Sequence, residues 1–226
     1  MSGFKRINVA LGMEETGLVP LFYHRDPQVC REVIAACHDG GARVFEFTNR
    51  GDFAHEVFAE VRKWALNELP DMMIGAGSIP DAPTAAIFMQ MGADFVVSPS
   101  LNPEVARICN RRKVLWIPGC GTMTEISQAE ELGAEIVKIF PGTAVGGPSF
   151  VKAVMGPCPW TSIMPTGGVE PTEENLAGWF GAGVTCVGMG SALVTDKIVE
   201  EGDWKTLEKT VRNTLNLIGR LRTTRS

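Results

Sequence analysis

Short apolar runs alternate along this chain with longer segments whose apolar residues recur at helical spacing. The apolar runs predict eight strands: Leu18–Tyr23, Arg43–Thr48, Met72–Ala76, Phe95–Ser98, Val114–Ile117, Ile136–Phe140, Ser162–Pro165 and Thr185–Gly188. The intervening segments, such as Pro27–His38, Phe53–Leu66 and the segment that starts at Trp204, place their apolar residues on one stripe, which predicts helices. Strands that alternate with helices indicate a parallel sheet of the α/β class.

Eight strand–helix units in 226 residues predict a single (β/α)8 TIM barrel that takes up residues 1–226 as one domain. We expect an extra N-terminal helix before Leu18, placed to close the bottom of the barrel. An open, doubly wound sheet is the structural alternative, and the regular repeat of the units favours the barrel. In a TIM barrel the reactive groups belong at the carboxyl ends of the strands.

Composition and charge narrow the function classes. The chain is 45% hydrophobic and 21% charged, which excludes a disordered or collagen-like protein. A net charge of −5 argues against a general nucleic-acid partner. No apolar run reaches the roughly 18 residues of a membrane span, and no signal sequence is evident, so a cytoplasmic location is expected. Six scattered cysteines and three histidines form no metal-ligand spacing, and we expect no metal and no cofactor.

Lys138 is the first candidate for chemistry because it interrupts a strand that should be buried on both faces. Burying an ammonium group is costly unless it is paired or neutralised. A neutral lysine amine attacks carbonyls and forms a Schiff base. The alternative is a structural lysine that is paired with a carboxylate or reaches solvent at the strand end.

Glu46 is the second candidate. Strand alternation places Val44, Glu46 and Thr48 on one face and two phenylalanines on the other, so Glu46 should point into the barrel. Lys138 is then its expected partner, and a carboxylate beside an amine suits proton transfer at an imine. Arg50, just past the strand, should stand at the barrel mouth. A purely structural ion pair remains the alternative.

Glycines close the last two strands. Gly167 and Gly168 follow the seventh strand, and Gly190 and Ser191 follow the eighth. The loops at these two places in TIM barrels often bind phosphate through backbone N–H groups. The pair of signals predicts an anion site.

Taken together, these segments resemble the class I pyruvate aldolases of the KDPG/KHG family, which cleave 2-keto-3-deoxy-6-phosphogluconate (KDPG) or 4-hydroxy-2-oxoglutarate (KHG). The resemblance runs from about Leu18 to Leu193. Its motifs are Val137-Lys-Ile-Phe-Pro141, Glu46-Phe-Thr-Asn-Arg50, Gly75-Ala-Gly-Ser78, Phe95-Val-Val-Ser-Pro99, Ile117-Pro-Gly119 and Pro165-Thr-Gly-Gly168. The departures are a serine at position 78, where the family has threonine, and the segment Leu21–Arg25, where many members carry an arginine.

The resemblance implies the following roles. Lys138 forms the imine and Glu46 is the general acid/base. Arg50 and Ser78 hold the pyruvyl carboxylate, and Pro99 and Phe140 form apolar walls. Thr166 contacts the sugar-acid part, while Gly167, Gly168, Gly190 and Ser191 hold the phosphate. The products are pyruvate and D-glyceraldehyde 3-phosphate, as in the Entner–Doudoroff pathway, and the enzyme is a homotrimer.

Other functions stay open at this point. Within the family, the substrate is KDPG, KHG or the 6-phosphogalactonate analogue of KDPG. Outside it, a sugar-phosphate isomerase or epimerase would use Lys138 only as a charge partner. A keto-acid-binding barrel without turnover is the non-enzyme alternative.

Overall fold

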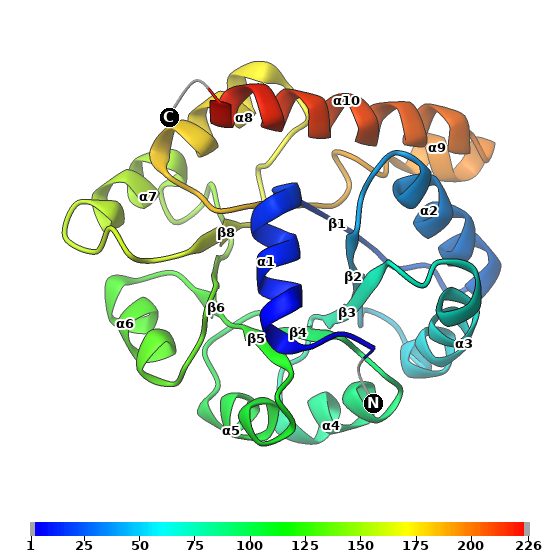
Figure 1. Ribbon diagram of the computed structural model, residues 1–226, viewed down its shortest axis with the longest axis horizontal. Coiled ribbons are helices and arrows are strands. Elements are labelled where there is room, and N and C mark those ends of the chain that lie inside the picture. Colours follow the sequence, from blue (N-terminus) through cyan, green and yellow to red (C-terminus); the bar gives the residue numbers. More distant parts are fainter. Residues whose placement is uncertain (1–2, 224–226) are drawn as a thin grey trace.

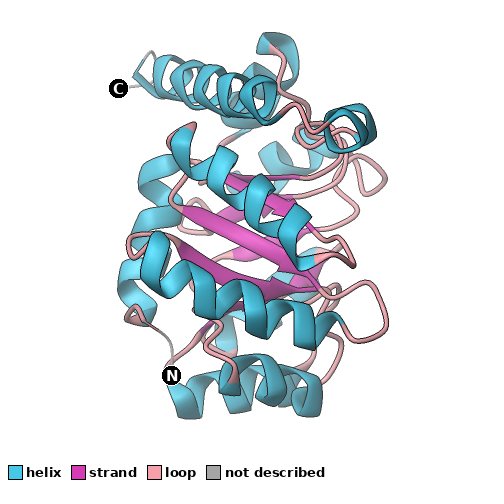
Figure 2. Cartoon of the chain, turned by 90° about the vertical axis from the view of Figure 1, so that its right-hand side faces the viewer, coloured by secondary structure: helices cyan, strands magenta, loops and turns pink. Residues whose placement is uncertain are grey.

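The computed structural model describes residues 3–223, so the ends of the predicted domain at residues 1 and 226 lie outside the described residues. Parallel strands curl around one axis inside a ring of helices (Figures 1 and 2). The strands are β1 (Leu18–Phe22), β2 (Val44–Thr48), β3 (Met73–Gly77), β4 (Phe95–Val97), β5 (Leu115–Ile117), β6 (Gly119–Cys120), β7 (Val137–Ile139), β8 (Ile163–Pro165) and β9 (Val187–Met189).

The strands form two hydrogen-bonded groups, β5-β4-β3-β2-β1-β9 and β6-β7-β8. A bridge between Thr166 and Gly188 joins β8 to β9, and β5 continues into β6 through Pro118, so the ring is completed on both sides. The predicted TIM barrel is therefore confirmed, and the open sheet is excluded. All eight predicted strands are present, with ends that shift by one or two residues. The additional segment β6 arises because Pro118 has no N–H and interrupts the fifth strand.

The helices are α1 (Arg6–Thr16), α2 (Pro27–Asp39), α3 (Ala54–Glu68), α4 (Ala82–Gln90), α5 (Pro103–Arg112), α6 (Met123–Glu131), α7 (Gly147–Met155), α8 (Glu173–Ala182), α9 (Asp196–Glu201) and α10 (Trp204–Thr223). Several of these helices start at an N-cap residue whose short polar side chain accepts a hydrogen bond from the first turn. Thr122 accepts a hydrogen bond from the Glu125 N–H, and Glu125 accepts one from the Gly121 N–H, so these side chains fix the start of α6.

The apolar core has two layers. Phe45 and Phe47 point outward from β2 and pack with the surrounding helices, whereas Val44 points inward with Phe95 and Leu115. Helix α1 lies across one end of the barrel (Figure 1), where its Val9 and Met13 side chains join the inner layer. The predicted N-terminal helix is thus present and closes the amino-terminal end of the barrel. Within residues 3–223, no helix is both long and apolar enough to span a bilayer.

Candidate active site

A buried ion pair crosses the inside of the barrel. Lys138 on β7 is 5% exposed and Glu46 on β2 is 1% exposed. Lys138 Nζ lies 3.7 Å from Glu46 Oε1, while Glu46 Oε2 has no hydrogen-bond partner among the described residues. The inward direction predicted for Glu46 and its pairing with Lys138 are both confirmed. The second carboxylate oxygen is left available to a substrate or a water molecule, as a general acid/base requires.

Glu46 occupies space that a side chain on the neighbouring strand would fill. Thr48 and Gly77 are register partners on β2 and β3. A Cβ atom built on Gly77 would lie 1.9 Å from Glu46 Oε1 and 2.5 Å from its carboxyl carbon. A glycine inside a strand often marks such a close approach. Gly77 therefore fixes where the carboxylate lies.

Arg50 and Ser78 meet at the carboxyl ends of β2 and β3. The Arg50 Nε–H donates to Ser78 Oγ at 3.5 Å, and the Arg50 side chain is otherwise exposed at the mouth. Ser78 has φ +58°, a left-handed conformation that is unusual for a residue other than glycine. The Asn49 N–H donates to the Gly77 carbonyl and ties the two strand ends together. The structure thus brings a guanidinium and a hydroxyl group to one edge of the mouth.

An aromatic ring flanks the lysine, and a proline stands at the end of β4. The Phe140 ring lies with its centroid 5.0 Å from Lys138 Nζ, close enough for a cation–π contact. Pro99 follows β4, and its carbonyl packs directly over Gly119, where a Cβ atom would lie 2.2 Å from the oxygen. Both residues stand at the carboxyl ends of their strands, as the sequence predicts.

Thr166 presents a buried hydroxyl with no partner. Its Oγ1 atom has no hydrogen-bond partner among the described residues, although the residue is only 6% exposed. A Cβ atom on Gly188 would lie 2.3 Å from that oxygen, so the hydroxyl faces the middle of β9. An unpaired buried hydroxyl is costly, and a substrate group would satisfy it.

The two glycines after β8 both have positive φ, +92° at Gly167 and +76° at Gly168. The Gly142 N–H donates to the Thr166 carbonyl, and the Thr143 N–H donates to the Gly167 carbonyl. Among residues 3–223, the N–H groups of Gly168 and Val169 find no acceptor. Consecutive free N–H groups form a nest that suits an anion. Gly190 and Ser191 follow the adjacent strand β9, and Ser191 is exposed.

Sequence reasoning assigned no role to three residues that shape this site. Gly77 makes room for Glu46, Thr143 packs against Gly168, and Asn175 on α8 hydrogen-bonds the glycine loop. A glycine within a strand was the available signal for Gly77. The other two act through contacts between loops that are distant in sequence, which no local pattern indicates.

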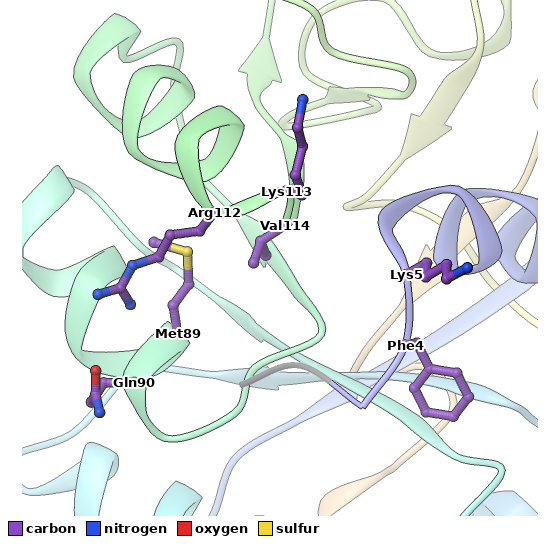
Figure 3. Close-up of a pocket in the computed structure, with 7 residues that line it drawn as sticks. All are labelled: Phe4, Lys5, Met89, Gln90, Arg112, Lys113 and Val114. Carbon is purple, nitrogen blue, oxygen red and sulfur yellow. The ribbon is translucent and has the colours of Figure 1, made fainter.

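Apart from the lysine–glutamate pair, a cavity of about 510 Å³ lies near the amino-terminal end of the barrel, next to α4 and α5. Figure 3 shows that Lys5 and Lys113 point away from each other there and that Arg112 lies on another side. Arg112 and Lys113 stand at the carboxyl end of α5, whose helix dipole they complement. The cationic groups around this cavity therefore do not converge on one point.

The geometry defines a class of protein: a TIM barrel whose mouth joins a buried lysine–glutamate pair to an arginine and a glycine-rich loop. Residues 9–210 match the family model described as KDPG and KHG aldolase. A 2-dehydro-3-deoxy-phosphogluconate aldolase from Pseudoalteromonas atlantica is 34% identical over 83% of this chain and 84% of that protein. The enzyme with the same name from Pseudomonas aeruginosa is 36% identical over 78% and 77%.

A solved structure of KDPG aldolase from Legionella pneumophila superimposes with a TM-score of 0.82. It is 24% identical and covers 91% of this chain and 97% of that one, which supports the fold. The chain belongs to the KDPG/KHG aldolase family. It is an aldehyde-lyase, so the isomerase and the pure binding protein are set aside.

Proposed function

We propose that this class I aldolase cleaves KDPG, or a closely related 2-keto-3-deoxy acid, to pyruvate and D-glyceraldehyde 3-phosphate. The observation that carries the proposal is the buried pair of Lys138 and Glu46, 3.7 Å apart inside the barrel. A carboxylate beside a buried amine suits proton transfer at an imine, which supports the proposal. The names of the curated relatives agree with this substrate.

The reaction begins when Lys138 Nζ attacks the C2 carbonyl of the keto acid. Glu46 gives and takes the protons, directly or through a water molecule, as the carbinolamine forms and loses water to become the imine. Glu46 then accepts the proton of the C4 hydroxyl while the C3–C4 bond breaks and the aldehyde leaves. The protonated imine takes up the electron pair as an enamine. Protonation at C3 and hydrolysis release pyruvate and restore the lysine.

The substrate spans the mouth. Arg50 and Ser78 bind the pyruvyl carboxylate, where a guanidinium gives a charge-assisted hydrogen bond. Phe140 and Pro99 exclude water next to the imine, and the Thr166 hydroxyl binds a substrate hydroxyl. The loop of Gly167 and Gly168, together with Gly190 and Ser191, holds the distal phosphate through backbone N–H groups.

Substitution of Lys138 tests this proposal. We expect Lys138→Met to abolish retro-aldol cleavage of KDPG while the protein stays folded, and Glu46→Gln to lower kcat about 100-fold or more. Lys152→Met, at an exposed lysine of α7, is the matched control and should keep full activity. Release of pyruvate is followed by a coupled dehydrogenase assay. Activity of Lys138→Met comparable to that of the unsubstituted enzyme would refute the proposal.

The phosphate site is tested by a second substrate. KDPG should be preferred to KHG by a large factor in kcat/KM, since KHG lacks the phosphate that the glycine loop binds. Equal values would contradict the phosphate site.

We further propose that residues 1–226 form one domain, which assembles as a homotrimer in the cytoplasm, with no nucleic-acid or membrane partner. The free state of all six cysteines supports a reducing compartment. The family resemblance supports self-association. Light scattering on the purified protein would measure the mass of the assembly, and a monomer would refute the trimer.

A further inference from the structure

The glycine loop after β8 is held by its carbonyl groups. Those of Thr166 and Gly167 accept N–H groups of the loop after β7, at 2.8 and 3.2 Å. A Cβ atom on Gly168 would lie 2.1 Å from Thr143 Cγ2, so the two loops are in close contact. The third carbonyl, that of Gly168, turns away from β7 and toward helix α8.

Asn175, in the first turn of α8, closes the loop with both ends of its amide group. Its Nδ2–H donates to the Gly168 carbonyl at 3.0 Å, and its Oδ1 accepts from the Glu170 N–H at 3.0 Å. Trp179 lies one helical turn further on, and its Nε1–H donates to the same carbonyl at 3.4 Å. The Asn175 N–H in turn donates to Thr172 Oγ1 at the helix cap.

The bound carbonyl groups fix the direction of the N–H groups on the other side of the loop. A peptide unit is planar, so a carbonyl fixed in one direction fixes the following N–H in the opposite direction. With the Gly167 and Gly168 carbonyls bound, the N–H groups of Gly168 and Val169 are held facing away from Thr143 and α8. Two glycines with positive φ would otherwise let these peptides rotate freely.

We propose that Asn175 is a positioning residue for the distal end of the substrate. It acts through the Gly168 carbonyl and orients the Val169 N–H of the phosphate-binding loop, with Trp179 in a supporting role. The inference rests on the proposed function and adds a specificity determinant outside the barrel mouth. Asn175 also borders a cavity of about 320 Å³ on the outer side of the loop, so its removal would admit water behind the loop.

The test compares substrates that differ at their distal end. Asn175→Ala should lower kcat/KM for KDPG about tenfold, mostly through KM, because two hydrogen bonds that order the loop are lost. Cleavage of KHG, which has no phosphate, should change less than about twofold, as should borohydride trapping of pyruvate on Lys138. Inorganic phosphate should inhibit the variant about tenfold more weakly. Trp179→Phe, which keeps a ring and loses the N–H, should show the same selectivity with a smaller effect.

Asn110→Ala is the matched control. Asn110 on α5 also uses both ends of its amide, donating to the Leu132 carbonyl at 3.0 Å and accepting from Arg6 Nη1 at 2.5 Å, at the opposite end of the barrel. It should lower stability without changing the preference between substrates. Equal losses on KDPG and KHG in both Asn175→Ala and Trp179→Phe, or an equal shift in Asn110→Ala, would overturn the inference. Failure of the unsubstituted enzyme to trap pyruvate would instead refute the proposed function.

Discussion

Replacing Gly77 with alanine should displace the candidate catalytic carboxylate of Glu46 while leaving its chemistry unchanged. Gly77 has a strand conformation that alanine also adopts, so the effect is purely steric. The new Cβ would lie 1.9 Å from Glu46 Oε1 and 2.6 Å from Glu46 Cγ, whereas ordinary contacts begin at 3.4 Å. The carboxylate must therefore retreat by about 1.5 Å. Since a displacement of about 1 Å can cost a catalytic group 100-fold, we expect kcat to fall on the order of 100-fold.

The assay is retro-aldol cleavage of KDPG in Gly77→Ala, together with the free energy of unfolding in urea. Overpacking should cost about 1–3 kcal/mol, which leaves the protein folded. Gly12→Ala is the matched control, since its Cβ would approach the flexible end of Met73 at 2.8 Å on the amino-terminal side of the barrel. It should keep full activity.

A double-mutant cycle separates the local effect on Glu46 from general damage. In a Glu46→Ala background the carboxylate is gone, so Gly77→Ala should add less than about a twofold further loss. Activity of Gly77→Ala within threefold of the unsubstituted enzyme would show that the new methyl group does not displace Glu46. An equal loss from Gly77→Ala in the Glu46→Ala background would show that the effect does not pass through Glu46.

Two further predictions concern stability and reactivity. Arg62→Met leaves Asp94 buried without the guanidinium group that lies 2.9 Å away. The free energy of unfolding in urea should therefore fall by about 3–5 kcal/mol. A fall of less than about 1 kcal/mol would contradict this prediction. Burial raises the pKa of Cys30 to about 11 and that of Cys109, Cys120 and Cys186 to about 12, so these thiols stay protonated at pH 8. The half-buried Cys158 should therefore react first with a maleimide, and faster labelling of Cys120 would contradict the assignment.

The sequence predicted the barrel because apolar runs and helical stripes repeat with little variation. It also predicted the inward direction of Glu46, since strand alternation leaves one choice once Phe45 and Phe47 face the helices. The pairing with Lys138 followed because a buried carboxylate requires a cation. These inferences depend on local periodicity and on the energetic cost of burying charge.

The remaining features depend on contacts between distant segments. The closeness of Gly77 to Glu46 is set by the register of β2 against β3, which the sequence does not state. The bond from Asn175 to the Gly168 carbonyl depends on how α8 docks beside the loop. The interruption of the fifth strand at Pro118 was readable in principle, because proline cannot donate to a strand ladder.

The most direct test of Lys138 as the Schiff-base residue is borohydride reduction in the presence of pyruvate, followed by intact mass measurement and peptide mapping. We expect one reduced pyruvyl adduct per chain, carried by Lys138, and no adduct in Lys138→Met. An adduct on a different lysine, or none in a folded protein that binds pyruvate, would contradict the assignment of Lys138 as the Schiff-base residue.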